Sequence, residues 1–444
     1  MSQEIKELVV YCPAGHSSND IVFPSYQNFI RSNGNCDLCT KEHFIQEFKT
    51  WSSGNAEIDE IIQEFPINNI YDKLHWIPYN NFQNIKHIAD GGHGSVYSAE
   101  LQNGIKWYWN FNTRDWEYEF IGYEVALKEI KDSRFDIVEF LKERKIVNSY
   151  EFSANYYGIS KNPSTQNYIF VMDLFDGDLH NFLAKKFWDL KWQLKIDILS
   201  SVASLLSGLH AKNLAHCNLH SGNILMNYNF NLHGLDCLDL GNDLILNSYN
   251  KNNEIYGLIP YIPPEVLRGN QFTSEGDIYS FGGIMYEIVT AQRPFADQAH
   301  DTYLMIDICN GVRSKVPDFM LNRIPEWYSD LMYRCWSDNP SERPTAAELD
   351  DFFYEVHIKC QDNIMDDDVM QQLKIADENQ QNISKSLKQE LLELFSYSSK
   401  LHPHSCFIGR YIHILHGLYD ILEEIKSGKS SDPNLLLKSN ETTT

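Results

Sequence analysis

The sequence predicts an α+β fold, in which a strand-rich region is followed by a mainly helical region within one large domain. The chain has 444 residues, of which 43% are hydrophobic, so it is long enough for such a domain plus extensions. The region that begins near residue 82 is expected to be mostly strand. Residues 192–210 instead have the apolar spacing of a helix, and a capping box formed by Thr345 and Glu348 opens the domain's last helix.

Two segments precede this domain, residues 1–50 and residues 51–81. Residues 57–65 read as a short amphipathic helix whose apolar side chains share one face, namely Ile58, Ile61, Ile62 and Phe65. Residues 74–79 then lead into the first strand of the domain. The first segment is a Cys/His lead-in and the second is a helical one.

The Cys/His lead-in carries a candidate metal site. Cys12-x₃-His16 and Cys36-x₂-Cys39 supply four ligands of the right softness for tetrahedral Zn²⁺. The Cys-x₂-Cys half has the usual spacing, whereas Cys-x₃-His is looser, and His43 could take the place of His16. The competing interpretation is a set of scattered cysteines in a short flexible segment. Zinc is therefore a hypothesis at this point.

Six short motifs follow one another along residues 82–357, and their order resembles that of the protein kinase superfamily. They are ADGGHGSV at 89–96, VALK at 125–128, HCNLHSGNIL at 216–225, DLG at 239–241, PPE at 263–265 and DIYSFG at 277–282. Arg343 stands where that family places the arginine that pairs with the PPE glutamate, Glu265. Cys335-Trp336, together with Arg343-Pro344, favours the tyrosine-kinase-like branch.

The resemblance implies a bilobal protein kinase fold, with an antiparallel β N-lobe, a helical C-lobe and ATP between them. It implies nucleotide contacts by Gly91, Gly94, Val96, Ala126, Lys128, Glu143, Met172 and Leu225. In the family the strand lysine holds the α- and β-phosphates, and the metal ligands bind Mg²⁺ through oxygen. By that correspondence Lys128, Asn218, Asn223 and Asp239 are the catalytic set, and Asn223 and Asp239 hold Mg²⁺.

Some of these assignments have alternatives. Glycines let backbone N–H groups approach phosphate, but a glycine-rich turn can also be a plain hairpin. Glu143 is expected to fix Lys128 from a helix over residues 138–147, and Glu139, one turn earlier, is the other candidate.

Three positions depart from the family pattern. Asn218 replaces the catalytic Asp, Cys217 replaces the neighbouring Arg, and Ala89 replaces the first glycine. An amide cannot accept the proton of a substrate hydroxyl as a carboxylate does, although its carbonyl can orient the hydroxyl. The resemblance therefore implies a signalling-type, pseudokinase-like protein that binds Mg-ATP, with strongly reduced or absent phosphotransfer.

Two other functions remain open. One is an active kinase that transfers the γ-phosphate of ATP to Ser/Thr or Tyr of proteins. The other is a zinc adaptor whose kinase-like domain is a scaffold. Without an arginine at position 217 the activation segment loses its usual phosphate partner, so Ser248, Tyr249 and Tyr256 are expected to be ordinary exposed loop residues. Cys217 itself is interpreted as a buried, unreactive thiol.

An aromatic insert and a C-terminal tail complete the chain. Residues 107–118 are expected to form a hairpin that covers the N-lobe sheet, with a binding patch as the alternative. Residues 358–426 read as a polar linker followed by helices at 384–397 and 404–426, and residues 427–444 as a disordered tail. The second helix could dock on the C-lobe, bind a partner or self-associate.

Composition narrows the partners and the compartment. The formal net charge of −24 disfavours nucleic acid and anionic lipid, which leaves ATP and a protein substrate or partner. No signal peptide is read at the N-terminus, and apolar stretches such as residues 281–289 are too short to span a bilayer. The expected location is the cytoplasm, where the nine cysteines are more plausible as buried thiols or metal ligands than as disulfides.

Overall fold

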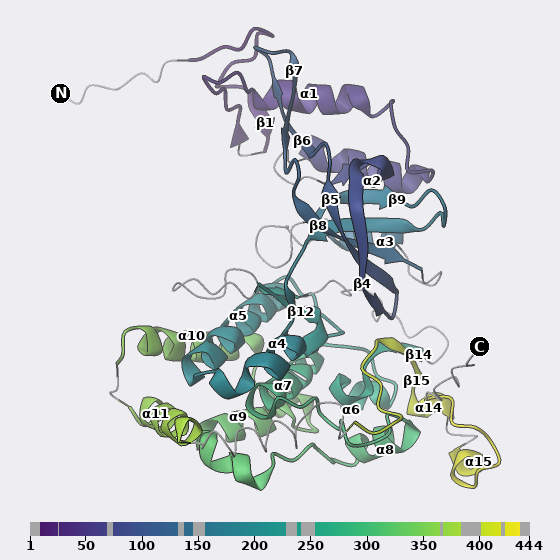
Figure 1. Ribbon diagram of the computed structural model, residues 1–444, viewed down its shortest axis with the longest axis vertical. Coiled ribbons are helices and arrows are strands. Elements are labelled where there is room, and N and C mark those ends of the chain that lie inside the picture. The colour runs from purple at the N-terminus through teal and green to yellow at the C-terminus, as the bar shows by residue number, and fades with distance from the viewer. Residues whose placement is uncertain are drawn as a thin grey trace. The chain divides into compact units, whose positions relative to one another are not determined.

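A computed structural model describes residues 9–24, 26–68, 74–131, 137–144, 156–227, 238–240, 254–364, 367–382, 401–418 and 422–435. The chain divides into two compact units (Figure 1). The first unit comprises Met1–Tyr150 and Asn155–Leu174, and the second comprises Glu151–Ala154 and Phe175–Thr444. The first contains the main β-sheet and the second is largely helical, so the predicted α+β fold with a sheet N-lobe and a helical C-lobe is confirmed.

The N-lobe is built on a six-stranded sheet. All neighbouring strands pair antiparallel except β3 and β9, which are parallel. Residues 74–79 were expected only to lead into this sheet, but two of them form its edge strand. In sheet order the strands are β3 (His75–Trp76), β9 (Tyr156–Lys161), β10 (Tyr168–Asp173), β8 (Glu124–Ile130), β5 (Gly94–Leu101) and β4 (Phe82–Gly91).

One face of this sheet carries the N-lobe core. Val125 and Leu127 of β8 point to this face, and they alternate along the strand with Ala126 and Lys128, because successive side chains of a strand point to opposite faces. The core cluster consists of Ile77, Phe82, Ala99, Leu101, Ile105, Val125, Leu127, Tyr157, Ile169 and Val171. Helix α3 (Ile137–Arg144) agrees with the helix predicted over 138–147, of which residues 145–147 lie outside the described part.

The lead-in adds two helices and a small hairpin to the first unit. Helix α1 (Asp37–Glu47) follows strands β1 (Ile21–Phe23) and β2 (Tyr26–Gln27). Helix α2 (Ala56–Asn68) confirms the predicted amphipathic helix, since its four predicted apolar residues are all at most 5% exposed.

The aromatic insert forms the predicted hairpin, from β6 (Ile105–Asn110) and β7 (Asp115–Glu119). Its side chains were expected to cover the N-lobe sheet, but several of them contact α1 instead. The ring of Trp109 stacks on His43 at 3.5 Å between centroids, and the ring of Trp116 lies 4.5 Å from that of Phe44. Aromatic composition predicts burial without identifying the partner, and here the partner lies some 70 residues earlier in the sequence.

The C-lobe is a helical bundle with short strands. Its helices are α4 (Leu179–Lys186), α5 (Trp192–Ala211), α6 (Pro264–Leu267), α7 (Ser274–Thr290), α8 (Thr302–Cys309), α9 (Glu326–Cys335) and α10 (Ala346–Gln361). The predicted capping box begins α10: the Glu348 N–H donates to Thr345 Oγ1 at 3.1 Å and the Thr345 N–H donates to Glu348 Oε2 at 2.7 Å. Strands β11 (Gly177–Asp178), β12 (Ile224–Met226) and β13 (Leu238–Leu240) form one sheet, and β14 (Glu254–Gly257) pairs with β15 (Arg410–His413).

Single 3₁₀ turns join these elements in both units. They are η1 (Tyr79–Asn81), η2 (Phe187–Asp189), η3 (Ser221–Asn223), η4 (Ile259–Tyr261), η5 (Asp318–Arg323) and η6 (Pro340–Glu342).

By length and composition, helix α5 could cross a membrane. The expectation that apolar stretches are too short for that did not take this helix into account. Its apolar residues are those of a helix at the centre of the C-lobe: Ile196, Leu199 and Val202 have no exposed surface. A helix that is apolar over most of its surface is typical of the interior of a large domain as well as of a membrane span.

The tail differs from its prediction at several points. The expected linker contains helix α11 (Asp368–Gln381), whose N-cap Asp367 accepts a hydrogen bond from the Met370 N–H at 2.9 Å. The helix predicted over 384–397 lies outside the described residues. The helix predicted over 404–426 is wrong: that stretch contains β15 and the short helices α14 (Leu415–Leu418) and α15 (Leu422–Lys426).

The described start of the predicted disordered tail is also ordered. Asn434 has no exposed surface, and its side chain bonds to the backbone of His413 in both directions. The two errors have different causes. Helical periodicity was read where alternate burial against β14 decides the conformation, and polar composition concealed a buried amide. Residues 436–444 lie outside the described part.

Candidate functional site: the catalytic-type loop and the Cys/His cluster

The loop over residues 216–225 is anchored by a buried carboxylate on α7. Asp277 accepts the backbone N–H of His216 at 2.7 Å and that of Cys217 at 2.9 Å, and it also lies 2.9 Å from His210 Nε2. Asp277 is only 1% exposed. A buried carboxylate with several donors is a strong constraint, so Asp277 fixes the backbone of the loop.

Of the two substituted positions in this loop, Cys217 is bonded to the anchor, and Asn218 follows it with its backbone N–H donating to His216 Nδ1 at 3.3 Å. Cys217 adopts a left-handed backbone with φ of 64°, an unfavourable conformation for a residue with a Cβ. Its Sγ lies 3.5 Å from the carbonyl of Ala215 and its side chain is buried, in agreement with the unreactive thiol predicted for it. Asn218 is 6% exposed, and its backbone carbonyl accepts a hydrogen bond from Asn223 Nδ2 at 2.9 Å.

The two predicted Mg²⁺ ligands are brought near each other by the β12–β13 pairing. Asn223 ends η3 immediately before β12, and Leu225 of β12 is paired with Asp239 of β13. This register places Asp239 opposite the strand that follows Asn223. The side chain of Asp239 lies outside the described part of the structure.

The predicted N-lobe nucleotide residues share one face of the sheet. Val96 is paired with Lys128, and Ala126 with Met172, across β5, β8 and β10. Because positions two apart on a strand face the same side, all four side chains lie on the face opposite the N-lobe core. Ala126 and Met172 are buried, whereas Lys128 is half-buried. An apolar face with one lysine suits a base and its phosphates.

The glycine-rich turn has an internal structural role as well. Gly91 and Gly94 are paired across the β4–β5 turn. A Cβ on Gly94 would lie 1.9 Å from the carbonyl oxygen of Glu129, whereas a Cβ on Gly91 would come no nearer than 3.7 Å to another atom. The close approach of β8 is therefore enough to require a glycine at position 94. Sheet packing does not require a glycine at position 91.

Three further predicted residues lie outside the described part of the structure, wholly or in their side chains. Glu143 belongs to α3, but its side chain lies outside the described residues, so the choice between Glu143 and Glu139 stays open. Ser248 and Tyr249 also lie outside them. Tyr256 was expected to be an exposed loop residue and this is wrong: it belongs to β14 and is 3% exposed.

The ion pair predicted between Glu265 and Arg343 is present and bidentate. Arg343 Nη1 donates to Glu265 Oε1 at 2.7 Å and Nη2 donates to Oε2 at 2.8 Å. Arg343 also donates through Nε to the carbonyl of Ser337 at 2.9 Å. Both charged residues are buried, so this fork joins η6 to α6 inside the C-lobe.

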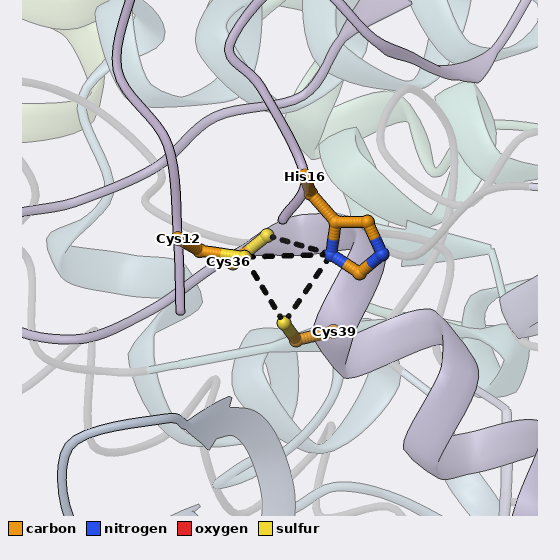
Figure 2. Close-up of side chains that lie close together, drawn as sticks. All are labelled: Cys12, His16, Cys36 and Cys39. Atoms are coloured by element: carbon orange, nitrogen blue, oxygen red, sulfur yellow. Dashed lines mark hydrogen bonds between the residues drawn. The ribbon is translucent and has the colours of Figure 1, made fainter. Parts of the chain in front are cut away.

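In the first unit, the side chains of Cys12, His16, Cys36 and Cys39 converge on one point (Figure 2). Their ligand atoms all lie within 4.8 Å of one another. His16 Nδ1 is 3.5 Å from Cys12 Sγ, 3.7 Å from Cys36 Sγ and 3.4 Å from Cys39 Sγ, and the Sγ atoms of Cys12 and Cys39 are 3.6 Å apart. The alternative ligand His43 is stacked on Trp109 instead.

Local structure explains why these ligands meet. Cys36 is the N-cap of α1, which places Cys39 in the first turn of that helix. Cys12 and His16 lie on either side of a tight turn, in which the Cys12 N–H donates to the His16 carbonyl at 2.9 Å. The three cysteines are at most 4% exposed, and Ile30, Leu38, Trp109 and Phe111 pack around them.

Electrostatics in the cluster favour a thiolate at Cys36 beside a thiol at Cys39, because the hydrogen bond between them lowers the pKa of Cys36 and raises that of Cys39. A hydrogen bond from the Cys39 thiol holds the pKa of Cys36 at about 4, far below the usual range of a thiol. Burial lowers the pKa of His16, but hydrogen bonds with Cys36 and Glu42 outweigh it and raise that pKa overall. His16 Nε2 lies 3.2 Å from Glu42 Oε1. A carboxylate on the outer nitrogen of a histidine is typical of histidines that ligate metal.

Sequence reasoning missed the partners of both sites. Glu42 could have been found, because it lies three residues after Cys39 on the same helix and so on the same face. The anchoring role of Asp277 was contained in the DIYSFG motif but was not drawn from it. The packing of Trp109 on the cluster has no local signal in the sequence.

Comparison with known proteins adds an independent finding. The family described as protein tyrosine and serine/threonine kinase matches residues 82–353, more than half of the chain. The probable serine/threonine-protein kinase kinX of Dictyostelium discoideum is 27% identical over 70% of this chain and 27% of its own length. A probable LIM domain-containing serine/threonine-protein kinase of the same organism is 27% identical over 60% of this chain and 37% of its own.

The similarity extends beyond that organism. The receptor-interacting serine/threonine-protein kinase 4 of Mus musculus is 26% identical over 59% of this chain and 32% of its own length. The chain thus spans well under half the length of these curated relatives.

Proposed function

Because the chain belongs to the protein tyrosine and serine/threonine kinase family, we propose that it is a pseudokinase-like signalling protein that binds Mg-ATP and transfers phosphate slowly or not at all. The observation that carries the proposal is Asn218, which stands in a well-anchored loop at the position of the family's catalytic Asp. We place the chain in the tyrosine-kinase-like branch on Cys335-Trp336 and Arg343-Pro344.

The residues that remain fit the nucleotide and its metal. The sheet face with Val96, Ala126, Lys128 and Met172 lies opposite the core, which suits a bound base and phosphates. Asn223 and Asp239, adjacent through the β12–β13 pairing, offer the oxygen ligands that Mg²⁺ prefers. When bound, ATP supplies the γ-phosphoryl group.

The chemistry of Asn218 limits the reaction. Its amide oxygen can accept a hydrogen bond from an acceptor hydroxyl and so orient it, but it does not take up the proton. General-base catalysis typically contributes about 10²–10⁴-fold. The transition state of phosphoryl transfer is loose, so positioning and charge neutralisation by Lys128 and the Mg²⁺ ligands still support a residual rate.

A slow but genuine kinase is the second candidate, and retention of Lys128, Asn223 and Asp239 favours it. In that case the acceptor is a Ser/Thr or Tyr hydroxyl of a protein. Several of its relatives are described as probable serine/threonine-protein kinases. The two candidates differ only in the rate of transfer, because both require ATP.

We place this protein in the cytoplasm, with proteins rather than nucleic acid or anionic membrane as partners, because its net charge of −24 repels both of the latter. A fluorescent fusion found in a secretory compartment or on membranes would contradict this assignment.

Nucleotide binding is tested by thermal unfolding with and without Mg-ATP. A ligand that binds only the native state raises the unfolding temperature, so saturating Mg-ATP should stabilise the parent protein. Lys128→Met should remove most of that shift. Lys374→Met, an exposed lysine on α11 of the second unit, is the control and should keep it. No shift in the parent protein at saturating nucleotide would refute the proposal.

We also propose that Cys12, His16, Cys36 and Cys39 hold one Zn²⁺ ion. For tetrahedral zinc with ordinary bond lengths, ligand sulfurs lie about 3.8 Å apart and sulfur lies about 3.5 Å from nitrogen. The observed distances of 3.4–3.7 Å match these values. Four protein ligands leave no open coordination position, so the role of this ion is structural.

Metal content tests the zinc centre. Gently purified protein should contain about one Zn²⁺ per chain. Cys36→Ser should lose it, whereas Cys360→Ser, a cysteine of α10 outside the cluster, should keep it. A parent protein with substoichiometric zinc, or a Cys36→Ser variant with full zinc, would contradict the assignment.

A further inference from the structure

The C-terminal segment, residues 401–435, returns to the C-lobe and adds a strand beside the catalytic-type loop. β15 pairs antiparallel with β14, in the register Glu254 with His413, Ile255 with Ile412, Tyr256 with Tyr411 and Gly257 with Arg410. β14 lies within the activation segment, between the DLG motif at 239–241 and the PPE motif at 263–265. Apart from β15, no other described strand pairs with it.

The end of β14 lies against Asn218. A Cβ built on Gly257 would be 3.5 Å from Asn218 Oδ1. Gly257 is also the residue paired with Arg410 of the tail. The tail strand therefore runs along the backbone edge that ends at the position where the family's acceptor hydroxyl is handled.

The tail strand is packed as tightly as a core element. Ile412 has no exposed surface, and its pairing partner Ile255 is 2% exposed. The rings of Tyr411 and Tyr256 meet edge to face at 5.3 Å. A Cβ on Gly409 would come within 2.5 Å of Tyr256 Oη, so this position of the tail requires a glycine.

Polar contacts on both sides of β15 hold the segment in place. Before the strand, the His300 N–H donates to the carbonyl of His404 at 3.1 Å. After it, Asp432 accepts from the N–H and the hydroxyl of Thr302 at 2.9 and 2.6 Å. Asn434 Nδ2 also donates to Thr302 Oγ1 at 3.1 Å. The segment is thus fastened to the N-terminal turn of α8 as well as to β14.

We infer that β15, held by the described residues 401–418 and 422–435 of the tail, occupies in cis the strand edge along which an extended acceptor polypeptide would pair beside Asn218. This inference rests on the proposed function, which places the acceptor hydroxyl beside Asn218 and so makes this edge the acceptor site. Addition of a strand to an exposed edge is a general mode of peptide recognition, in which the backbone supplies affinity and alternate side chains supply specificity.

The tail is a block rather than a substrate. Arg410, the tail residue paired with Gly257, carries no hydroxyl. The polypeptide that fits the edge has an aliphatic residue at the Ile412 position, an aromatic one at the Tyr411 position and a small one at the Gly409 position. Because the tail is tethered, its effective concentration is of order millimolar, so a free peptide at micromolar concentration cannot displace it.

Hydrogen exchange on the full-length chain tests whether the edge is covered. Amides of Glu254–Gly257 should be protected in the parent protein. Ile412→Asp places a charge in a fully buried position and should release them. Ile408→Asp, the same change at a residue of the segment that is 55% exposed, should leave the protection intact. Asn434→Ala removes the side-chain bonds of Asn434 to Thr302 and to the His413 backbone without adding charge, while the Asp432 contacts remain, and should give a smaller release.

A fluorescent peptide with the sequence of residues 405–418 then tests whether the edge binds strands. It should bind the Ile412→Asp chain at micromolar concentration and bind neither the parent nor Ile408→Asp. An unprotected β14 in the parent, or a released β14 that fails to bind the peptide in both Ile412→Asp and Asn434→Ala, would overturn the inference. Neither readout requires ATP, so failure of nucleotide binding would be seen separately, by the thermal shift.

Discussion

At the scale of single residues, the two changes in the catalytic-type loop alter its chemistry and leave its backbone in place. The loop is fixed by Asp277, whose carboxylate accepts the backbone N–H groups of His216 and Cys217 and needs neither side chain at 217 or 218. On the proposed function, Asn218 therefore stands in place of a carboxylate in an otherwise formed site. The buried ion pair of Arg343 and Glu265 likewise supports the fold and takes no part in the proposed chemistry.

The fork gives a stability prediction. Removing one partner of a buried ion pair leaves an uncompensated charge, so Arg343→Ala should lower the free energy of unfolding by about 3–5 kcal/mol. Arg334→Ala, an exposed arginine on the adjacent helix α9, is the control and should change it by about 0.5 kcal/mol or less. Denaturant unfolding of both variants provides the measurement, and equal loss in the two would show that the fork contributes nothing special.

At the scale of elements, the helices and strands that were predicted correctly are those whose signal lies within their own sequence. Helix α2 was predicted because its apolar residues repeat within the helix itself. The motifs at 125–128, 216–225 and 277–282 predicted a strand, a loop and a helix, respectively, because short sequences of fixed chemistry specify them. The tail could not be predicted this way. Ile412 is buried by β14, more than 150 positions earlier in the chain, and a local periodicity carries no information about such a partner.

The Cys/His cluster could be predicted only in part from the local sequence. Its ligands were predicted by spacing, and the choice of His16 over His43 required the fold. The packing of the aromatic hairpin on α1, through Trp109 and His43, left no trace in the local sequence. The hairpin was predicted, and its neighbour was not.

The zinc centre gives an element-scale prediction. Cys36 and Cys39 begin α1, and α1 carries His43 and Phe44 to the hairpin. Removal of zinc by a chelator should therefore increase amide exchange in both Asp37–Glu47 and Ile105–Asn110, while α7 of the C-lobe keeps its protection. Metal ligation contributes directly to the folding free energy of small sites. Unchanged exchange in α1 after complete metal removal would show that the cluster does not support this helix.

At the scale of the whole molecule, the two units carry separate parts of the proposed function. The first holds the sheet face with Lys128 and the Cys/His cluster, and the second holds Asn218, the predicted Mg²⁺ ligands and the tail strand that pairs with β14. We propose that two features of the second unit limit phosphotransfer independently, Asn218 through the chemistry and the tail through access of a polypeptide. Activity is therefore expected to respond to both changes, and ATP binding to neither.

The central claim is that Asn218 alone limits the chemistry of an otherwise formed site, and phosphotransfer by Asn218→Asp tests it most directly. The assay compares parent, Asn218→Asp and Asn218→Asp combined with Lys128→Met on a generic protein acceptor, with ATP affinity measured in parallel. Asn218→Asp should raise transfer by about 10²-fold or more because it restores the proton-accepting carboxylate. The affinity for ATP should change little, and the double variant should be inactive. A parent already as fast as an ordinary kinase, or an Asn218→Asp protein that binds ATP and remains inert even with the tail released by Ile412→Asp, would contradict the account.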